Sequence, residues 1–201
     1  PKDTNALLQV ADSVDFEFRL LRATIDTNTR QYQRIVDKIR LAVTGHRQGS
    51  LAKRRIALFG LTFKAGTDDL RDSPALAVAA LLRQAGAELT GYDPGMPASG
   101  LGSSAPQIAV AEDPYIAAKD VDAIVILTEW SEFRSLDWPR LATLTATPTL
   151  VDTRNLIDRD VAARAGFRWV GLGRRARAVS QSYSPAGAVI ALTDFQAITA
   201  S

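Results

Sequence analysis

The segment 60–74 contains side chains suited to binding a phosphorylated ligand, and it reads Gly-Leu-Thr-Phe-Lys-Ala-Gly-Thr-Asp-Asp-Leu-Arg-Asp-Ser-Pro. It follows an apolar run at 56–59 and precedes an alanine- and leucine-rich helical pattern, so we expect a turn between a first strand and a first helix. Open α/β sheets bind their ligands at turns of this kind. Lys64 and Arg71 offer positive charge to phosphate oxygens, while Phe63 offers an aromatic face to a base or a sugar.

Each of these residues also has a simpler structural interpretation. Phe63 can fill the top of the core beside a solvated Lys64, and Arg71 can pair with one of three nearby aspartates. Those aspartates have no histidine or cysteine near them, so we expect no metal site and assign them to shaping the loop. Residue spacing alone leaves both interpretations open.

The loop does not have the spacing of a dinucleotide fingerprint. It lacks Gly-x-Gly-x-x-Gly, the pattern that lets the backbone approach a pyrophosphate. Asp93 follows the second expected strand, where such domains carry a ribose-binding acid. Without the glycines, we expect Asp93 to be a turn residue ahead of Pro94 and the domain to bind a different nucleotide.

Further polar side chains stand at the ends of expected elements. The segment 152–155, Asp-Thr-Arg-Asn, follows a strand and puts Arg154 at the ligand-binding edge, unless its aspartate only caps the next turn. Asp3 lies at the start of a helical region, where an aspartate can simply cap free amides. We interpret the segment 128–130, Thr-Glu-Trp, as structural, with its tryptophan covering the sheet end and its glutamate exposed.

The segment 60–74 and the opening Pro-Lys-Asp-Thr together resemble the UDP-glucose/GDP-mannose dehydrogenase family. The resemblance extends from residue 1 to about residue 173. In that family the strand–loop–helix opens the nucleotide-sugar-binding C-terminal domain, and Pro-Lys-Asp ends the motif Gly-Gly-Ser-Cys-Phe-Pro-Lys-Asp. We therefore expect this chain to be the back half of an enzyme whose nucleophilic cysteine lies two residues before Pro1.

The resemblance implies ligand contacts for four side chains. Phe63 and Lys64 match the family's Phe-Lys pair, which contacts the nucleotide sugar. Arg154 lies in a closely similar Asp-x-Arg-Asn, whose arginine contacts the substrate, in some members across the dimer. Arg71 matches an arginine that reaches the dinucleotide bound by the other domain, and a planar guanidinium suits two phosphate oxygens.

The resemblance also assigns chemistry to the first residues. Asp3 would help to activate or orient the hydrolytic water, and Lys2 would lie near the NAD cofactor. The family oxidises the C6 hydroxyl of a nucleotide sugar to a carboxylate with two NAD, through an aldehyde and a cysteine thioester. This chain contains no cysteine and no dinucleotide fingerprint, so we expect it to be inactive alone.

The exact substrate and the class of protein stay open at this point. Asp93-Pro94 and the segment 128–130 favour UDP-glucose, whereas the segment 64–71 is equally typical of GDP-mannose enzymes, and a UDP-N-acetylhexosamine is a further alternative. A non-catalytic module for nucleotide-sugar binding or dimerisation is a different class of interpretation. Gly-Gly-Ser-Cys-Phe directly upstream of Pro1 would decide for the enzyme.

The pattern along the chain predicts how these residues are positioned. Short apolar runs alternate with amphipathic segments, which is typical of an α/β protein with a Rossmann-like, doubly wound parallel sheet. We expect a helical dimerisation segment at 1–45, a connector at 46–53, the nucleotide-sugar-binding domain at 54–173 and a tail at 174–201. The expected strands are 55–59, 88–92, 123–127, 149–151 and 168–170, and the expected helices are 74–84, 113–119 and 158–165.

A seam with a 3.5-residue period runs along the helix expected at 20–44. Its members are Leu21, Ile25, Asn28, Tyr32, Ile35, Ile39 and Ala42. Such a seam must be buried, either against a partner subunit or against the other half of the enzyme, and the pattern alone does not choose. In the family this helix links the two domains and forms the core of a dimer, so the resemblance favours a homodimer.

Composition excludes several classes of partner. The 201 residues carry a net charge of +2, and their basic clusters at 30–55 and 168–177 lack the interleaved aromatics of a nucleic-acid site. No stretch approaches 18 apolar residues, so we expect no membrane span. The absence of cysteine is compatible with a cytoplasmic protein.

Overall fold

A six-stranded, all-parallel sheet forms the centre of the computed structural model, which describes residues 2–97 and 108–173. The strand order is β3-β2-β1-β4-β5-β6, so the direction of winding reverses between β1 and β4. The strands are β1 (Arg55–Phe59), β2 (Glu88–Tyr92), β3 (Ala109–Val110), β4 (Ala123–Ile126), β5 (Thr149–Asp152) and β6 (Arg168–Gly171). This arrangement confirms the expected Rossmann-like sheet.

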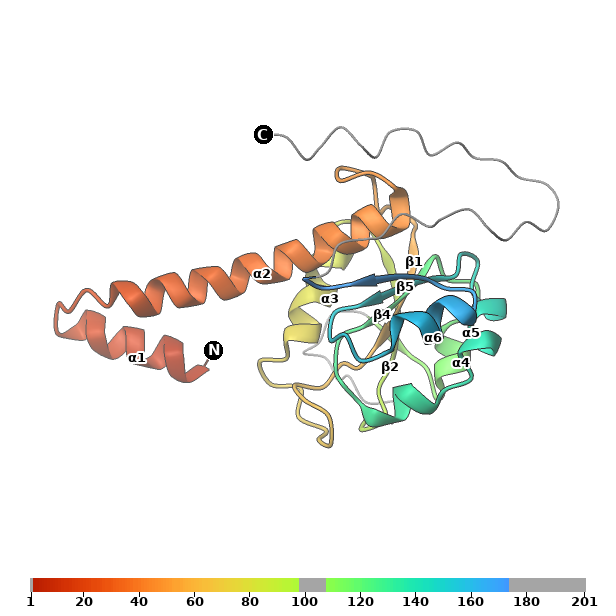
Figure 1. The fold of residues 1–201 in the computed structure, drawn as a ribbon. Helices are drawn as coiled ribbons and strands as arrows, with labels where there is room; N and C mark the ends of the chain where they lie inside the picture. The colour runs from red at the N-terminus through yellow and green to blue at the C-terminus, as the bar shows by residue number, and fades with distance from the viewer. Residues whose placement is uncertain (1, 98–107, 174–201) are drawn as a thin grey trace.

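Helices cover both faces of the sheet (Figure 1). They are α1 (Lys2–Ser13), α2 (Arg19–Thr44), α3 (Pro74–Gln84), α4 (Pro114–Ala117), α5 (Trp138–Leu144) and α6 (Arg159–Arg164), with a 3-10 turn, η1, at Ser131–Ser135. Side chains alternate along β1: Ile56 and Leu58 pack with α2 and α3, whereas Phe59 packs with the helices of the opposite face. Burial on both faces explains why the central strands read as continuous apolar runs.

The expected strands and helices are confirmed to within a few residues. The helix at 74–84 has the predicted bounds, and the Ser73 side chain accepts a bond from the Ala75 amide as its cap. Strand β3 was missed because a two-residue strand carries no periodic signal. Helix α5 was missed as well; it begins at Trp138 with Asp137 as its cap. The tail at 174–201 lies outside the described residues.

The N-terminal region is a helical hairpin that extends away from the sheet (Figure 1). The segment expected to be helical at 1–45 is interrupted between Ser13 and Arg19, and α1 folds back along α2 with an ion pair between Asp12 and Arg22. Helix α2 ends at Gly45, which adopts the left-handed conformation at φ 76°. In the described part of the chain, no helix has the combination of length and apolar character needed to span a membrane.

The apolar seam of α2 is divided between two environments. Ile39 and Ala42, with Val36, are buried in the core beside α3. The expectation that a partner subunit or another domain must cover the whole seam is therefore wrong for this end, because the chain buries it itself. Toward the hairpin tip the seam residues Leu21 and Ile25 are only half-buried, and the neighbouring Leu20, outside the seam, is 74% exposed.

We expect Ile39→Ala to destabilise the protein because it leaves a cavity where α2 packs on the sheet domain. Ile39 is 0% exposed, and such truncations cost about 2–5 kcal/mol of unfolding free energy. The matched control is Ile116→Ala, which removes the same atoms from a side chain that is 57% exposed and should change stability by less than about 0.5 kcal/mol. Urea unfolding measures both, and equal losses would contradict packing of α2 on the domain.

Candidate functional site

The turns that follow β1 and β4 meet where the strand order reverses. Gly60 has φ 89°, and a Cβ placed on it would lie 2.5 Å from the Thr128 Cβ, so only glycine allows this approach. The Thr128 hydroxyl then donates to the Thr62 carbonyl oxygen at 2.9 Å. This junction lies at the carboxyl edge of the sheet, where doubly wound folds bind ligands.

The loop after β1 closes on itself and presents Phe63 and Lys64 at its rim. The Phe63 amide donates to the Asp69 carbonyl oxygen at 2.8 Å, and the Ser73 hydroxyl donates to the Leu61 carbonyl oxygen at 2.7 Å. Phe63 is 41% exposed, and Lys64 is exposed. The Phe63 side chain therefore does not fill the top of the core, which was its structural interpretation from the sequence.

Arg154 follows β5 and is fixed by groups on neighbouring strand ends. Its amide donates to Asp152 Oδ1 at 3.0 Å. Its Nε donates to the Leu127 carbonyl oxygen at 2.7 Å and lies 3.1 Å from Glu129 Oε2. Both side-chain contacts use Nε, which leaves the two terminal nitrogens without a partner among the residues that the structure describes. A guanidinium held in this way can bind phosphate through its outer edge.

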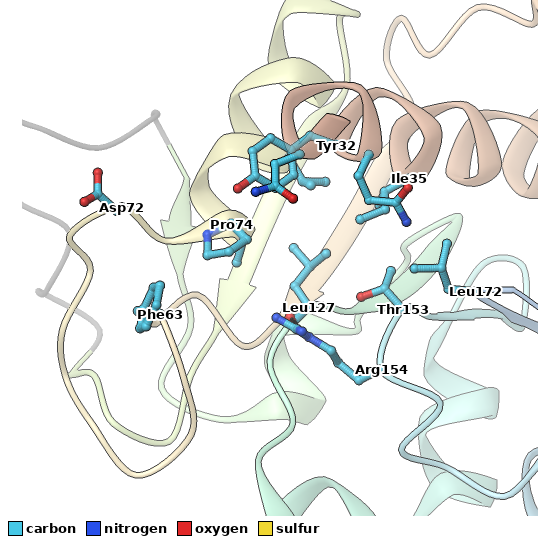
Figure 2. A pocket seen from close by; sticks show the side chains of 13 residues that line it. Tyr32, Ile35, Phe63, Asp72, Pro74, Leu127, Thr153, Arg154 and Leu172 are labelled. Atoms are coloured by element: carbon cyan, nitrogen blue, oxygen red, sulfur yellow. Dashed lines mark hydrogen bonds between the residues drawn. The ribbon is translucent and has the colours of Figure 1, made fainter. Parts of the chain in front are cut away.

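A cleft of about 440 Å³ lies between α2 and the carboxyl edge of the sheet (Figure 2). Phe63 and Arg154 line it from the sheet side, and Tyr32 and Ile35 line it from α2. Its volume falls in the usual range for small-molecule sites, about 300–1,000 Å³. The further lining residues are Asn28, Gln31, Asp72, Pro74, Ala75, Val78, Leu127, Thr153 and Leu172. The structure thus brings together two of the expected ligand-binding residues, Phe63 and Arg154.

Arg71 is engaged with a carboxylate in its own loop. Its Nε and Nη2 donate to the two oxygens of Asp69 at 2.9 and 2.8 Å, although the Arg71 side chain remains 88% exposed. The side-chain hydrogen bond from Arg71 is the main cause that lowers the pKa of Asp69 to about 2. The sequence had left open that Arg71 pairs with a nearby aspartate, and the structure contains this pair.

The remaining expected site residues lie elsewhere. Asp3 is exposed in the first turn of α1, where its negative charge suits the helix dipole. Lys2 begins the same helix, and its side chain lies outside the described part. Of the described residues, those lining the cleft include neither Asp3 nor Lys64 nor Arg71. The residues expected to contact the cofactor or the hydrolytic water, Arg71 and Asp3, therefore lie outside the lining of the cleft.

Sequence reasoning missed two contributions to the site. Asn28 and Gln31 of α2 line the cleft, and the available signal was a polar residue, Asn28, inside an otherwise apolar seam. Glu129 is exposed as expected, but its contact with Arg154 was not foreseen. Trp130 covers the sheet end as expected, being 8% exposed.

Comparison with known proteins gives consistent matches. The model of the UDP-glucose/GDP-mannose dehydrogenase family, UDP binding domain, matches residues 57–159. A UDP-glucose 6-dehydrogenase of Rhizobium meliloti (strain 1021) is 45% identical over 177 residues, which are 87% of this chain and 39% of that protein. The chain therefore spans about two-fifths of the length of that relative.

Two solved structures share the fold at similar coverage. A UDP-glucose dehydrogenase from Pyrobaculum islandicum aligns with a TM-score of 0.63 and 28% identity, covering 85% of this chain and 36% of its own. A GDP-mannose dehydrogenase from Pseudomonas aeruginosa aligns with a TM-score of 0.60 and 29% identity, covering 78% of this chain and 35% of its own.

We expect Arg71→Gln to raise the pKa of the Asp69 carboxyl from about 2 toward the ordinary value of about 3.9. The depressed pKa means that the pair stabilises the loop above about pH 4 and that this contribution is lost as the pH falls through about 2. Carbon-detected NMR titration of the Asp69 carboxyl measures the shift, with Lys64→Gln as the control that keeps the pair. A carboxyl that titrates at the same pH in both variants would show that the pair does not persist in solution.

Proposed function

Because this chain belongs to the UDP-glucose/GDP-mannose dehydrogenase family, we propose that it is the nucleotide-sugar-binding part of an NAD-dependent UDP-glucose 6-dehydrogenase. One observation carries the proposal: Phe63 and Arg154, from turns far apart in the sequence, line the same cleft at the switch point of the sheet. A mixed cleft with one exposed aromatic and one anchored guanidinium suits a ligand that combines a nucleoside, phosphates and a sugar. The identity to the Rhizobium meliloti protein favours UDP-glucose as the substrate.

The residues around the cleft divide the binding task. Phe63 packs against the base or the sugar, because its ring is accessible at the rim of the loop. Arg154 binds phosphate oxygens with its two terminal nitrogens, since its Nε is already held by the Leu127 carbonyl oxygen. Lys64, exposed beside Phe63, adds a charge-assisted bond to the diphosphate or to a sugar hydroxyl. Each of these interactions needs an open carboxyl edge of the sheet.

The oxidation itself depends on groups beyond this cleft. Two NAD molecules would supply the hydride acceptors for the four-electron oxidation of the C6 hydroxyl to a carboxylate. Arg71 fits an NAD phosphate in this proposal, because its guanidinium is 88% exposed and Asp69 already sets its orientation. In this proposal Lys2 lies near the cofactor, and Asp3 orients the hydrolytic water. The nucleophilic cysteine belongs to a segment that this cysteine-free chain does not contain, so the chain alone is expected to produce no NADH.

We further assign the exposed hairpin surface to a homodimer in the cytoplasm. Large apolar side chains with at least 48% exposure lie along α1, in the turn after it and at the start of α2: Leu7, Val10, Val14, Phe16 and Leu20. Burying one side chain of this size contributes about 1.5–3 kcal/mol of favourable free energy. Leaving these five side chains in contact with water is therefore unfavourable. A second copy packed along α2 would cover this surface, as the resemblance implies.

Lys64→Ala should weaken UDP-glucose binding without changing the fold. Loss of a charge-assisted bond costs about 1.5–3 kcal/mol, which is roughly a tenfold to hundredfold higher dissociation constant. Calorimetric titration with UDP-glucose, beside a thermal melt, measures affinity and stability together. Lys119→Ala, at an exposed lysine on α4's side of the sheet, is the matched control and should bind as the wild type does.

If Lys64→Ala binds UDP-glucose with unchanged affinity, Lys64 is a solvated surface charge and not a ligand contact. Titrating GDP-mannose and UDP-N-acetylmannosamine into the wild type separates the alternative substrates, because the proposal requires UDP-glucose to bind more tightly than either. A wild-type chain that binds none of the three nucleotide sugars would overturn the proposed function.

The chain should self-associate through the hairpin, giving about twice its mass of 21.7 kDa in light scattering. Leu20→Asp should shift the population to monomer, because a carboxylate would then have to be buried at the centre of the contact. Ile116→Asp places the same charge on an exposed residue of the opposite layer and should leave the dimer intact. A wild type that is monomeric at all concentrations would rule out this role for the hairpin.

A further inference from the structure

Asp93, the first residue after β2, is a buried carboxylate bonded to the turn that carries Phe63. It is 1% exposed. Its Oδ2 accepts bonds from the Leu61 amide at 2.6 Å, the Thr62 amide at 2.9 Å and the Thr62 hydroxyl at 2.9 Å. The Trp130 indole nitrogen lies 3.3 Å from the same oxygen. A role as a turn residue ahead of Pro94 accounts only for the other oxygen, Oδ1, which accepts from the Gly95 amide at 2.9 Å.

The Asp93 carboxylate accepts from backbone amides of the first turn, which in related folds face a bound ligand. In a dinucleotide domain the first turn presents its backbone to a pyrophosphate, and the acid after the second strand binds a ribose. Here the acid after β2 bonds directly to two consecutive amides of the first turn. The protein thus supplies from its own side chain the negative charge that a nucleotide would otherwise bring, and a buried carboxylate with several donors is strongly held.

The same bonds fix the residues next to the binding rim. Thr62 is 0% exposed and is bonded on one side to Asp93 and on the other to Thr128. Phe63, the following residue, then leaves the clamped backbone at the edge of the cleft. A Cβ on Gly95 would lie 2.6 Å from the Thr67 carbonyl oxygen, so the segment after Asp93 packs directly against this loop.

We propose that Asp93 is a positioning residue that replaces a bound nucleotide in ordering the first turn, so that Phe63 and Lys64 are arranged for the nucleotide sugar before it binds. Pre-ordering removes the entropy cost of immobilising these side chains on binding. The consequence for affinity rests on the proposed function, whereas the ordering of the turn does not. Asp93 touches no ligand atom in this scheme and acts through Leu61 and Thr62.

The test compares Asp93→Asn with Asp158→Asn in the 201-residue chain. Asp158 is an exposed carboxylate that accepts from two backbone amides at the start of α6 and does not line the cleft, so the control makes the same carboxylate-to-amide change outside the site. In Asp93→Asn without ligand, we expect the ¹⁵N relaxation order parameters of Phe63 and Lys64 to fall from about 0.85 toward 0.6. UDP affinity should fall about tenfold, as expected when two side chains must be ordered on binding. Because asparagine caps helices about as well as aspartate does, Asp158→Asn should leave the melting temperature and both readouts nearly unchanged.

Unchanged order parameters in a folded Asp93→Asn, or unchanged UDP affinity despite a mobile turn, would each overturn the positioning role. A wild type that does not bind UDP would instead refute the proposed function, and the relaxation data would still decide whether Asp93 orders the turn. If Asp93→Asn does not fold, Thr62→Val removes one donor and keeps the carboxylate. Weaker UDP binding at a nearly native melting temperature would then support the role, and native affinity would overturn it.

Discussion

The close approach of the turns after β1 and β4 is the constraint on which the site depends. It exists because Gly60 has no side chain to meet Thr128, and because the Thr128 hydroxyl then satisfies a buried carbonyl oxygen of Thr62. Any larger residue at position 60 would force the two strand ends apart. Phe63 would then leave the rim of the cleft that it shares with Arg154.

Helix α2 serves the core and the site with different parts of one surface. Its carboxyl-terminal part is buried with α3, and the Arg168 guanidinium donates to the Ala42 carbonyl oxygen at that end, where a cation complements the helix dipole. About two to three turns before Ala42, Tyr32 and Ile35 line the cleft. The same helix therefore packs in the core and lines the cleft, so that under the proposed function a change in its packing would also change ligand binding.

Positive charge at the carboxyl edge is largely balanced within the protein before any ligand arrives. Arg71 is bonded to Asp69, and Arg154 lies beside Glu129. Both pairs are at least partly solvent-exposed, so each is individually weak and screened by salt. A diphosphate can compete for such arginines, while the carboxylates keep their side chains oriented in its absence. This arrangement favours specificity through geometry over affinity through unpaired charge.

The sequence by itself determined the local structure and the family of this protein. Apolar runs gave the main strands, Ser73 and Pro74 marked the start of α3, and the 60–74 segment pointed to nucleotide-sugar dehydrogenases, which the family match bears out. These features depend on residues close together in the chain. Only the tertiary structure decided that α2 buries its own seam, that Glu129 contacts Arg154, and that Asp93 bonds to a residue 32 positions away. The Asp93 contact follows from the pairing of Phe59 with Tyr92, and the Glu129 contact follows from the pairing of Ile126 with Asp152. Register between distant strands leaves no signal in a local pattern.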